Sequence, residues 1–168
     1  QIVSDRHKVC NGRLEVKVMK LTGEVLNSYN RNVKVDANSS KALFSVPLDE
    51  ALKGARKEDV FIHAVLLTDK GNSNYTNNYF LVKQKEVNYP KAQLATSVQP
   101  IEGGFEVTLS SDNFARAVFI ATGDVNSSFS DNYFDILPGS SVKVEVYTDL
   151  PLATFEKQLK VVSLSDEY

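Results

Sequence analysis

The amino-acid sequence predicts an all-β protein built from two tandem antiparallel β-sandwiches. Three observations support this fold class. Apolar residues alternate with polar residues along most of the chain, as they do in strands with one buried and one wet face. Helical periodicity is nearly absent, and polar turn residues separate short strand-like segments. The length of 168 residues is enough for two small domains of roughly 80 to 90 residues each.

The first half of the chain predicts seven strands. In the clearest of them Leu14, Val16 and Val18 point one way, and a turn at Gly23 returns the chain as a hairpin. Segment 60–67 is apolar on both faces, as a central strand should be. The other strands are expected at 2–5, 25–26, 32–35, 41–46 with Ala42, Phe44 and Val46 alternating, and 78–82. Seven strands is the number that an immunoglobulin-like sandwich needs.

One short helix and two breaks interrupt this pattern. Segment 48–54 carries helix formers, acids near its start and Gly54 where a C-cap would sit, so we expect one helical turn. A turn is expected at 69–72. Segment 87–90 is typical of an extended linker, because a proline disfavours helix in the residue before it. These breaks set the expected domains at 1–88 and 89–168.

The second half predicts another immunoglobulin-like sandwich. Phe105, Val107 and Leu109 alternate with polar residues directly after the Gly103-Gly104 turn. Further strands are expected at 118–120, 142–146 and 159–164. Segment 137–139 has Pro and Gly in the positions that a type II turn requires.

Composition narrows the classes of partner. The net charge of −2 provides no field that would hold nucleic acid or an anionic membrane. No apolar run approaches the roughly 18 residues needed to span a bilayer, and Gln1 opens directly into a strand-like stretch, so we expect a fragment or processed piece.

Cys10 is the only cysteine, which excludes an intrachain disulfide and indicates an inert, partly buried thiol. Sequons begin at Asn38, Asn74 and Asn126, and in a eukaryotic secreted protein they would mark surface turns.

Two stretches carry a family resemblance. Residues 130–139 (SDNYFDILPG), followed by an alternating Val-Lys-Val-Glu-Val strand, resemble the final domain of β-mannosidases of glycoside hydrolase family 2. The first half is similar to the domain that precedes it in those enzymes. The matching segments, in the same order, are 12–18, 23–26, 37–40, 58–62 and 77–80.

The resemblance implies a larger parent enzyme. Its parts would be a jelly-roll domain, an immunoglobulin-like domain, a catalytic barrel with a pair of glutamates, and then these two C-terminal sandwiches. The barrel's alternating strand-helix pattern is not present in this sequence, so no catalytic residue and no cofactor of the family is transferred to any position here. Exo-glucosaminidases and mannosylglycoprotein endo-β-mannosidases share the architecture. The resemblance also implies a parent that is periplasmic or secreted in a bacterium, or lysosomal in a eukaryote.

Acidic side chains were weighed as catalytic groups. A retaining glycosidase needs two carboxyl groups roughly 5 to 5.5 Å apart. Asp49 with Glu50, and Glu58 with Asp59, are adjacent pairs around the expected helical turn, where solvated charge near a helix start explains them. We therefore assign no catalytic residue to this chain.

Two sequence patterns resemble metal sites, but each lacks ligands that such a site requires. Segment 124–135 places oxygen-bearing side chains at calcium-loop spacing, but Phe129 occupies the position that requires glycine, and Asp135 replaces the bidentate glutamate. Local turns in which Asp and Asn side chains bond backbone amides explain the segment better. His7 and His63 have no acidic or cysteine partner at ligand spacing, and we expect His63 to be a hydrogen-bonded strand residue. No metal site is predicted.

Three functions follow, in order of preference. The first is a non-catalytic accessory region that packs against the barrel of the parent chain and stabilises it. The second is a carbohydrate-binding module for mannose-containing glycans, for which aromatic faces would supply the stacking surface. The aromatic candidates, beside nine Phe, are Tyr29, Tyr75, Tyr79, Tyr89, Tyr133 and Tyr147. The third is an independent enzyme, for which we expect no turnover. Separated from its barrel, the chain should expose an apolar patch around residues 75–80, which would favour self-association.

Overall fold

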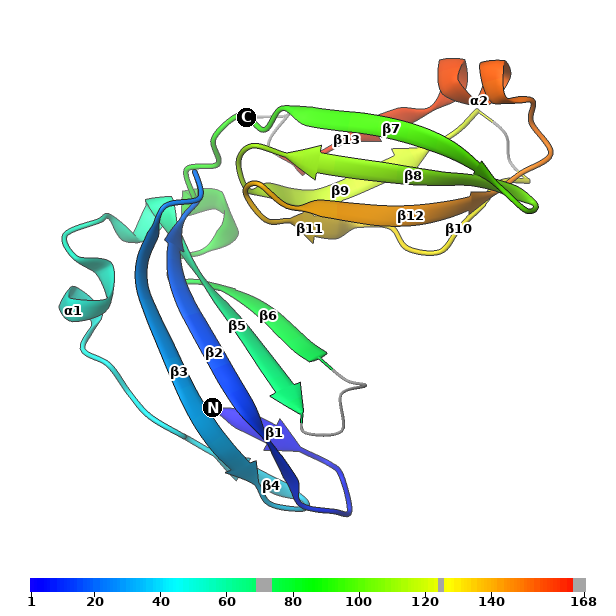
Figure 1. Ribbon diagram of the computed structural model, residues 1–168. Helices are drawn as coiled ribbons and strands as arrows, with labels where there is room; N and C mark the ends of the chain where they lie inside the picture. Colours follow the sequence, from blue (N-terminus) through cyan, green and yellow to red (C-terminus); the bar gives the residue numbers. More distant parts are fainter. Residues whose placement is uncertain (69–73, 124–125, 165–168) are drawn as a thin grey trace. The chain divides into compact units, whose positions relative to one another are not determined.

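A computed structural model describes residues 1–68, 74–123 and 126–164. Its contacts divide the chain into two compact units, and each is described by itself below. Unit 1 comprises Gln1–Lys20 and Glu24–Asn88, and unit 2 comprises Leu21–Gly23 and Tyr89–Tyr168. The described residues are mainly in antiparallel strands, as the sequence predicts (Figure 1).

Unit 1 is built on one long four-stranded sheet, in the order β3-β2-β5-β6, with every neighbouring pair antiparallel. The strands are β2 (Cys10–Lys20), β3 (Val25–Val35), β5 (Val60–Thr68) and β6 (Asn74–Phe80). A small second layer is formed by β1 (Ile2–Ser4) paired with β4 (Ser39–Lys41), the chain that follows β4, and the helix α1 (Leu48–Leu52). The predicted hairpin of β2 and β3 and the predicted central position of β5 are confirmed.

The inner face of this sheet carries two small cores rather than one. At one end Val18, Leu26 and Val60 pack with Ala51 and Leu52 of α1. At the other end Leu14, Val33 and Val35 pack beneath Ile2, Leu43 and Phe44. Because the second layer is small, the inner side chains of β5 and β6 between these cores are only partly covered. This incomplete cover creates the hollow described below.

Some expected elements of unit 1 differ from the structure. The described part of unit 1 has six strands and not the seven expected, because the strands expected at 25–26 and 32–35 are one strand, β3. The strand expected at 41–46 is confined to β4, which ends at Lys41. Leu43 and Phe44 both contact the core, whereas Ala42 is exposed, so the alternation predicted there is wrong. Strict alternation requires a paired strand, and 42–47 has none in the described structure. The helical turn is confirmed, although the left-handed C-cap residue is Lys53, one position before Gly54. The turn expected at 69–72 lies outside the described residues.

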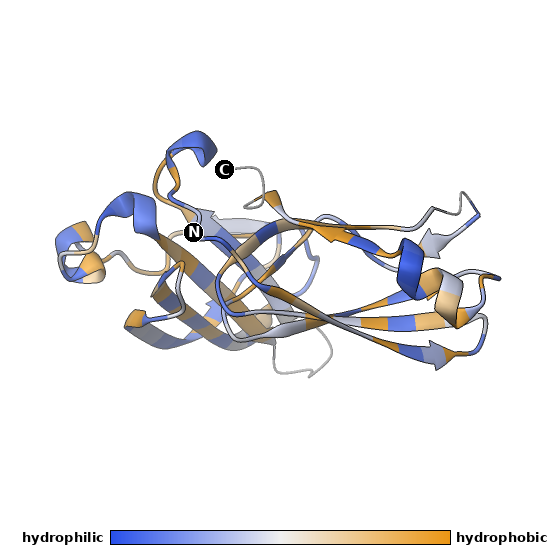
Figure 2. Ribbon diagram, turned by 90° about the horizontal axis from the view of Figure 1, so that it is seen from above, coloured by the Kyte–Doolittle hydropathy of each residue, from blue (hydrophilic) through white to orange (hydrophobic). Residues whose placement is uncertain are grey.

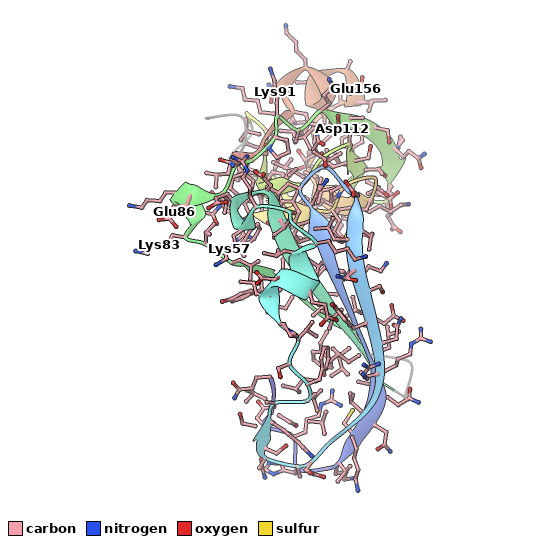
Figure 3. The ribbon with its side chains drawn as sticks, turned by 90° about the vertical axis from the view of Figure 1, so that its left-hand side faces the viewer. Lys57, Lys83, Glu86, Lys91, Asp112 and Glu156 are labelled. Carbon is pink, nitrogen blue, oxygen red and sulfur yellow. The ribbon has the colours of Figure 1, made fainter. Side chains whose placement is uncertain are left out.

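Two short 3₁₀ turns of polar residues flank strands β5 and β6 in unit 1. A 3₁₀ turn η1 (Lys57–Asp59) precedes β5, and a second, η2 (Gln84–Glu86), follows β6. In η2 the Glu86 carboxylate accepts a hydrogen bond from the Lys83 backbone N–H at 3.2 Å. Figure 3 shows both side chains on this short segment. The linker expected at 87–90 carries no helix or strand, in agreement with the effect of Pro90.

Over its described residues, unit 2 is a two-layered sandwich of seven strands. One sheet has the order β10-β12-β8-β7 and the other has the order β11-β9-β13, with all pairs antiparallel. The first sheet comprises β7 (Leu94–Ile101), β8 (Gly104–Ser111), β10 (Ser128–Phe129) and β12 (Ser141–Tyr147). The second comprises β9 (Ala115–Ala121), β11 (Phe134–Ile136) and β13 (Lys160–Val162). Figure 1 shows the two layers face to face.

The core of unit 2 lies between the layers. Phe105, Val107 and Leu109 of β8 are buried, with half-buried neighbours between them, as predicted. Val144 and Val146 of β12 alternate in the same way. Figure 2 shows this alternation as orange and blue bands along the strands. The remaining buried members are Ala92, Ala115, Val118, Ile120, Ile136 and Phe155. Unit 2 therefore has a single continuous core, unlike unit 1.

The two glycines that open β8 have separate causes. Gly103 has φ +79°, the left-handed backbone that a glycine adopts without strain. Gly104 lies opposite Tyr147, and a Cβ there would stand 2.0 Å from the Val146 carbonyl oxygen. The expected turn at 137–139 is confirmed by Gly139 at φ +69° and by a hydrogen bond from the Ser140 N–H to the Leu137 carbonyl at 3.0 Å.

Four elements of unit 2, namely α2, β7, β10 and β11, have no counterpart in the sequence prediction. The helix α2 (Leu152–Gln158) buries Phe155 against Phe105, with ring centroids 4.4 Å apart. The apolar residues of β7 are Leu94, Ala95, Val98 and Ile101, and they do not recur at every second position. As an edge strand, β7 has no fully buried residue, so its sequence shows no clear alternation. The segment before β7 is held by the turn after β8. The Asp112 carboxylate accepts from the Gln93 N–H at 2.9 Å, and the Asn113 amide donates to the Lys91 carbonyl at 3.0 Å.

Candidate functional site

A hollow of about 690 Å³ opens on the inner face of the unit 1 sheet. Its floor is formed by inward-pointing side chains of β2 and β5, among them Val16, Ile62, Ala64 and Leu66. One wall is β1 with the residues that follow it, and the facing wall is β6. This volume falls within the range of roughly 300 to 1,000 Å³ that small-molecule sites occupy. The hollow is slightly larger than a second one of about 640 Å³, which is lined by residues of β2, β3 and β5.

The rim of the hollow is aromatic and polar. The cross-strand pairing of β6 with β5 puts Tyr75, Asn77 and Tyr79 on the inner face. The Tyr75 and Tyr79 side chains are 47% and 60% exposed. The Arg6 guanidinium lies over the Tyr75 ring, 5.5 Å from its centroid, and also donates a hydrogen bond to the Tyr75 hydroxyl. Tyr79 therefore presents the more accessible ring. The sequence marks both tyrosines, but nothing in it brings Arg6 to Tyr75.

A second exposed aromatic surface lies on unit 2. Tyr133 is 69% exposed, and its ring stacks on Phe119 with centroids 4.9 Å apart. Val162 lies directly opposite Phe119 on the neighbouring strand β13 and is about half exposed. We call Phe119, Tyr133 and Val162 the Tyr133 patch. It occupies the outer face of the three-stranded sheet.

Tyr133 is held in an unusual backbone conformation. Its φ is +61°, in the left-handed region that bulky side chains rarely adopt. The preceding residue explains how this conformation is maintained. The Asn132 side-chain amide accepts from the Ile120 N–H and donates to the Ile120 carbonyl, both at 2.9 Å, so that it replaces a missing strand partner of β9. Asn132 also accepts from the Tyr133 N–H at 3.1 Å. The Asp-Asn pair is a sequence signal for such a turn, but it does not reveal the left-handed tyrosine.

The acidic pairs weighed as catalytic groups lie in unit 1, away from the hollow. Asp49 and Glu50 are exposed in the first turn of α1. Asp59 accepts two hydrogen bonds from Arg56, at 2.8 and 3.1 Å, and one from the Asn88 amide at 2.7 Å. The Arg56 hydrogen bonds, followed by that of Asn88, hold the pKa of the Asp59 carboxyl below its usual range. A carboxylate fixed in this way ties down the end of unit 1 and remains ionised.

The residues weighed as metal ligands have structural partners or solvent around them. His63 Nδ1 lies 2.8 Å from the Asn78 side-chain oxygen on the outer face of the unit 1 sheet, as expected for a hydrogen-bonded strand residue. His7 is exposed. Among the described residues there is no group of three or more His, Cys, Asp and Glu side chains placed to hold a metal ion.

The segment weighed as a calcium loop makes local hydrogen bonds, as the turn interpretation predicts. Its first residue, Asp124, lies outside the described residues. The Asp131 carboxylate accepts from the Asn132 N–H at 2.8 Å. Asp135 pairs with Arg116 and accepts from the Ala117 N–H at 3.1 Å. These contacts fix β11 to β9.

Several smaller predictions also have a place in the structure. Cys10 is a half-buried free thiol on the lining of the hollow. Asn38 and Asn126, which begin two of the three sequons, are exposed, whereas the side chain of Asn74 lies outside the described part. None of the described helices has the length and hydropathy of a transmembrane span.

Comparison with known families matches both halves of the chain. Residues 1–86 match the family described as "Mannosidase Ig/CBM-like domain". Residues 89–167 match an Ig-fold domain family of mannosidases. None of the curated proteins compared with the chain matched it.

Solved structures show the same fold. A β-D-mannosidase from Dictyoglomus thermophilum superposes with a TM-score of 0.71 at 23% identity, over 96% of this chain and 19% of that one. The exo-chitosanase of Amycolatopsis orientalis superposes with a TM-score of 0.59 at 15% identity, over 96% of this chain and 24% of that one. The chain thus spans about a fifth to a quarter of the length of these enzymes. From both family matches, the chain belongs to the immunoglobulin-like domains of mannosidase-type glycoside hydrolases.

Proposed function

We propose that this chain is the non-catalytic C-terminal accessory region of a β-mannosidase of glycoside hydrolase family 2, or of a close relative, and that it stabilises the catalytic barrel of its parent by packing against it. The observation that carries the proposal is the Tyr133 patch. It is an exposed aromatic surface whose central residue is held in strained backbone geometry by Asn132.

The strain gives this surface its functional meaning. A left-handed backbone costs a non-glycine residue roughly 1 to 2 kcal/mol. Such conformations are maintained by the surrounding structure and concentrate where a side chain must be presented for binding. A rigid, exposed aromatic ring supported by a second ring is also typical of the few residues that dominate an interface. The Tyr133 patch therefore fits a contact with another domain better than it fits open solvent.

The proposal is tested by separating the accessory region from its barrel. The upstream part of the parent and this chain would be produced as two polypeptides, and their affinity measured by calorimetry. We expect binding that raises the melting temperature of the barrel, and a loss of at least about tenfold in affinity, or 1.4 kcal/mol, for Tyr133→Ala. Tyr147→Ala is the matched control, because Tyr147 is an exposed tyrosine on the other sheet of the same unit.

A substitution that relieves the strain sharpens the test. Tyr133→Gly removes the left-handed penalty but also the stacking on Phe119, which is worth roughly 0.5 to 1.5 kcal/mol. We expect the isolated chain to keep nearly its original stability while its affinity for the barrel falls. Equal affinities for the Tyr133 and Tyr147 variants, or no association of the two polypeptides, would refute the packing proposal.

Carbohydrate binding is a second candidate function, favoured by the hollow of unit 1. Tyr79 offers an exposed ring, and Asn77, Arg6 and Asp5 supply hydrogen-bonding groups beside it. Aromatic faces stack on the apolar faces of sugar rings, and a mannose-containing glycan is the ligand that the family suggests. Calorimetric titration with mannobiose and longer manno-oligosaccharides tests this function. We expect Tyr79→Ala to abolish any signal and Tyr147→Ala to retain it. Absence of heat at millimolar sugar excludes the candidate.

The activity and location of the parent are part of the proposal. Hydrolysis with retention of configuration would be carried out by two carboxyl groups of the barrel, and not by this chain. An aryl β-mannoside should therefore be hydrolysed by the complete parent and not by this chain alone. We also propose that the parent acts in the periplasm or outside the cell in a bacterium, or in the lysosome in a eukaryote. Cell fractionation with an antibody against this chain tests the location.

A further inference from the structure

Strand β6 forms one edge of the unit 1 sheet. It is the terminal strand in the order β3-β2-β5-β6, and it pairs with β5 from Phe80 back to Asn74 without a register shift. In the described residues, no strand pairs with its other side. A regular edge strand presents unpaired backbone groups that another strand can use.

The other edges of the described sheets are protected. On the opposite edge of the same sheet, β3 carries Arg31 and Lys34. In unit 2, β7 carries Pro100, which lacks a backbone N–H. The remaining edge strands β1, β4, β10, β11 and β13 have two or three residues each. Charges, prolines and short lengths are the devices by which proteins prevent edge pairing. The sequence of β6, NYTNNYF, contains no charged residue, no proline and no glycine.

The sequence of β6 is also self-complementary. When two copies are aligned antiparallel over the full seven residues, Asn77 lies opposite its own counterpart. Tyr75 then lies opposite Tyr79 of the other copy, and Thr76 opposite Asn78. Aromatic pairs and hydroxyl–amide pairs are favourable across strands, and this register brings no like charges together. We propose that a second copy of this chain pairs through β6, so that the two sheets become one eight-stranded sheet with two-fold symmetry.

This register also joins matching faces of the two sheets. Residues directly opposite each other in a sheet point to the same side, so the inner faces of both copies lie on one side of the joined sheet. The two pairs of Tyr75 with Tyr79 then flank the Asn77 pair on the inner face, beside the two hollows. A register shifted by one residue would place the inner face of one copy beside the outer face of the other. The full-length register alone pairs all seven residues.

Association is tested on the chain with a charge at the symmetry axis. Light scattering should give twice the monomer mass of 18.6 kDa at high protein concentration. We expect Asn77→Lys to be monomeric, because two ammonium groups would lie directly opposite each other. The matched control is Asn30→Lys, an exposed asparagine near the middle of the opposite edge strand β3, which should remain dimeric. Circular dichroism verifies that both variants are folded.

A disulfide trap tests the register itself. In a Cys10→Ser background, Asn77→Cys should cross-link two copies under mild oxidation, since self-opposed Cα atoms lie roughly 4.5 to 5.5 Å apart, within disulfide range. Tyr79→Cys is the matched control on the same face. Its two copies would be about 13 Å apart, so it should not cross-link.

Each outcome decides the proposal. The proposal would be overturned if the unsubstituted chain were monomeric. It would also be overturned if Asn77→Lys formed dimers, or if the cysteines at positions 77 and 79 cross-linked equally. Binding of a sugar or of an extended peptide to the monomer at this edge, with no dimer formed, would assign the edge to that occupant and overturn it as well. Since Tyr133 takes no part in this interface, failure here leaves the barrel-packing proposal unaffected.

Discussion

Asn132 shows how one side chain sets the conformation of the segment around it. Its amide donates to and accepts from the backbone of Ile120, which is how a neighbouring strand would bind at that position. Ile120 is fully buried, so these backbone groups have no access to water if the amide is removed. The left-handed Tyr133 follows as a consequence of this anchoring rather than of its own preference.

Replacing Asn132 should therefore destabilise unit 2. We expect Asn132→Ala to lower the free energy of unfolding by about 1 to 3 kcal/mol, because buried donors and acceptors lose their partners. Asn132→Asp keeps the shape and the acceptor but places an oxygen against the Ile120 carbonyl, so the loss should be larger. Urea unfolding of both variants measures the difference. If Asn132→Ala were as stable as the unsubstituted chain, the anchoring role of Asn132 would be contradicted.

Asp59 provides a pH-dependent prediction. Its pKa is lowered in the folded state, mainly by the hydrogen bonds from Arg56 and then by that from Asn88. A lowered folded-state pKa stabilises the fold above the pKa of the unfolded chain, about 3.9, and this stabilisation is lost as the pH falls through the folded-state pKa. Asp59→Asn should thus be slightly less stable than the unsubstituted chain at neutral pH, and this difference in stability should vanish in acid. Urea midpoints across the pH range test this, and a difference independent of pH would refute the assignment.

At the scale of elements, the strands that bury one face could be predicted from the sequence and the others could not. Strands β8 and β12 alternate strictly because their apolar side chains face the opposite sheet. Strand β7 buries little, and 42–47 has no paired neighbour, so neither follows the alternation rule. The sequence does not indicate the helix α2, because its seven residues contain a single fully buried side chain, Phe155, and no amphipathic period.

The contribution of α2 can be measured through that side chain. Phe155 fills the space beside Phe105, with the rings stacked 23° from parallel. We expect Phe155→Ala to lower the free energy of unfolding by roughly 3 to 5 kcal/mol, the usual range for a buried phenylalanine. Leu152→Ala, at an exposed position of the same helix, should change it by less than about 1 kcal/mol. Similar effects of the two substitutions would show that α2 does not cover the core.

At the scale of the whole molecule, the two units differ in how their apolar residues are organised. Unit 2 has one continuous core shared by both sheets and α2, whereas unit 1 has two small clusters separated by the hollow. The sequence indicated two domains through Pro90 and the strand count. It could not indicate the hollow or the Tyr133 patch. Both depend on which side chains are left exposed by the packing of segments that are distant in the sequence.

This difference predicts unequal stability. Local opening is easiest where few apolar contacts are buried, and hydrogen exchange reports it strand by strand. We expect the amides of β8, β9 and β12 to exchange most slowly, and those of β2, β3 and β5 to exchange at least about tenfold faster. Hydrogen-exchange mass spectrometry of this chain provides the measurement. Equal protection of the two groups of strands would contradict the prediction.

The position of Cys10 makes its thiol a natural probe of whether the hollow is occupied. Its sulfur is the sole thiol of the chain, and Cys10 is among the residues that line the hollow. An occupant that fills this space, such as a sugar, should shield the sulfur from reagents in solution. The rate of alkylation at Cys10 therefore measures occupancy directly, without mutation, tag or label.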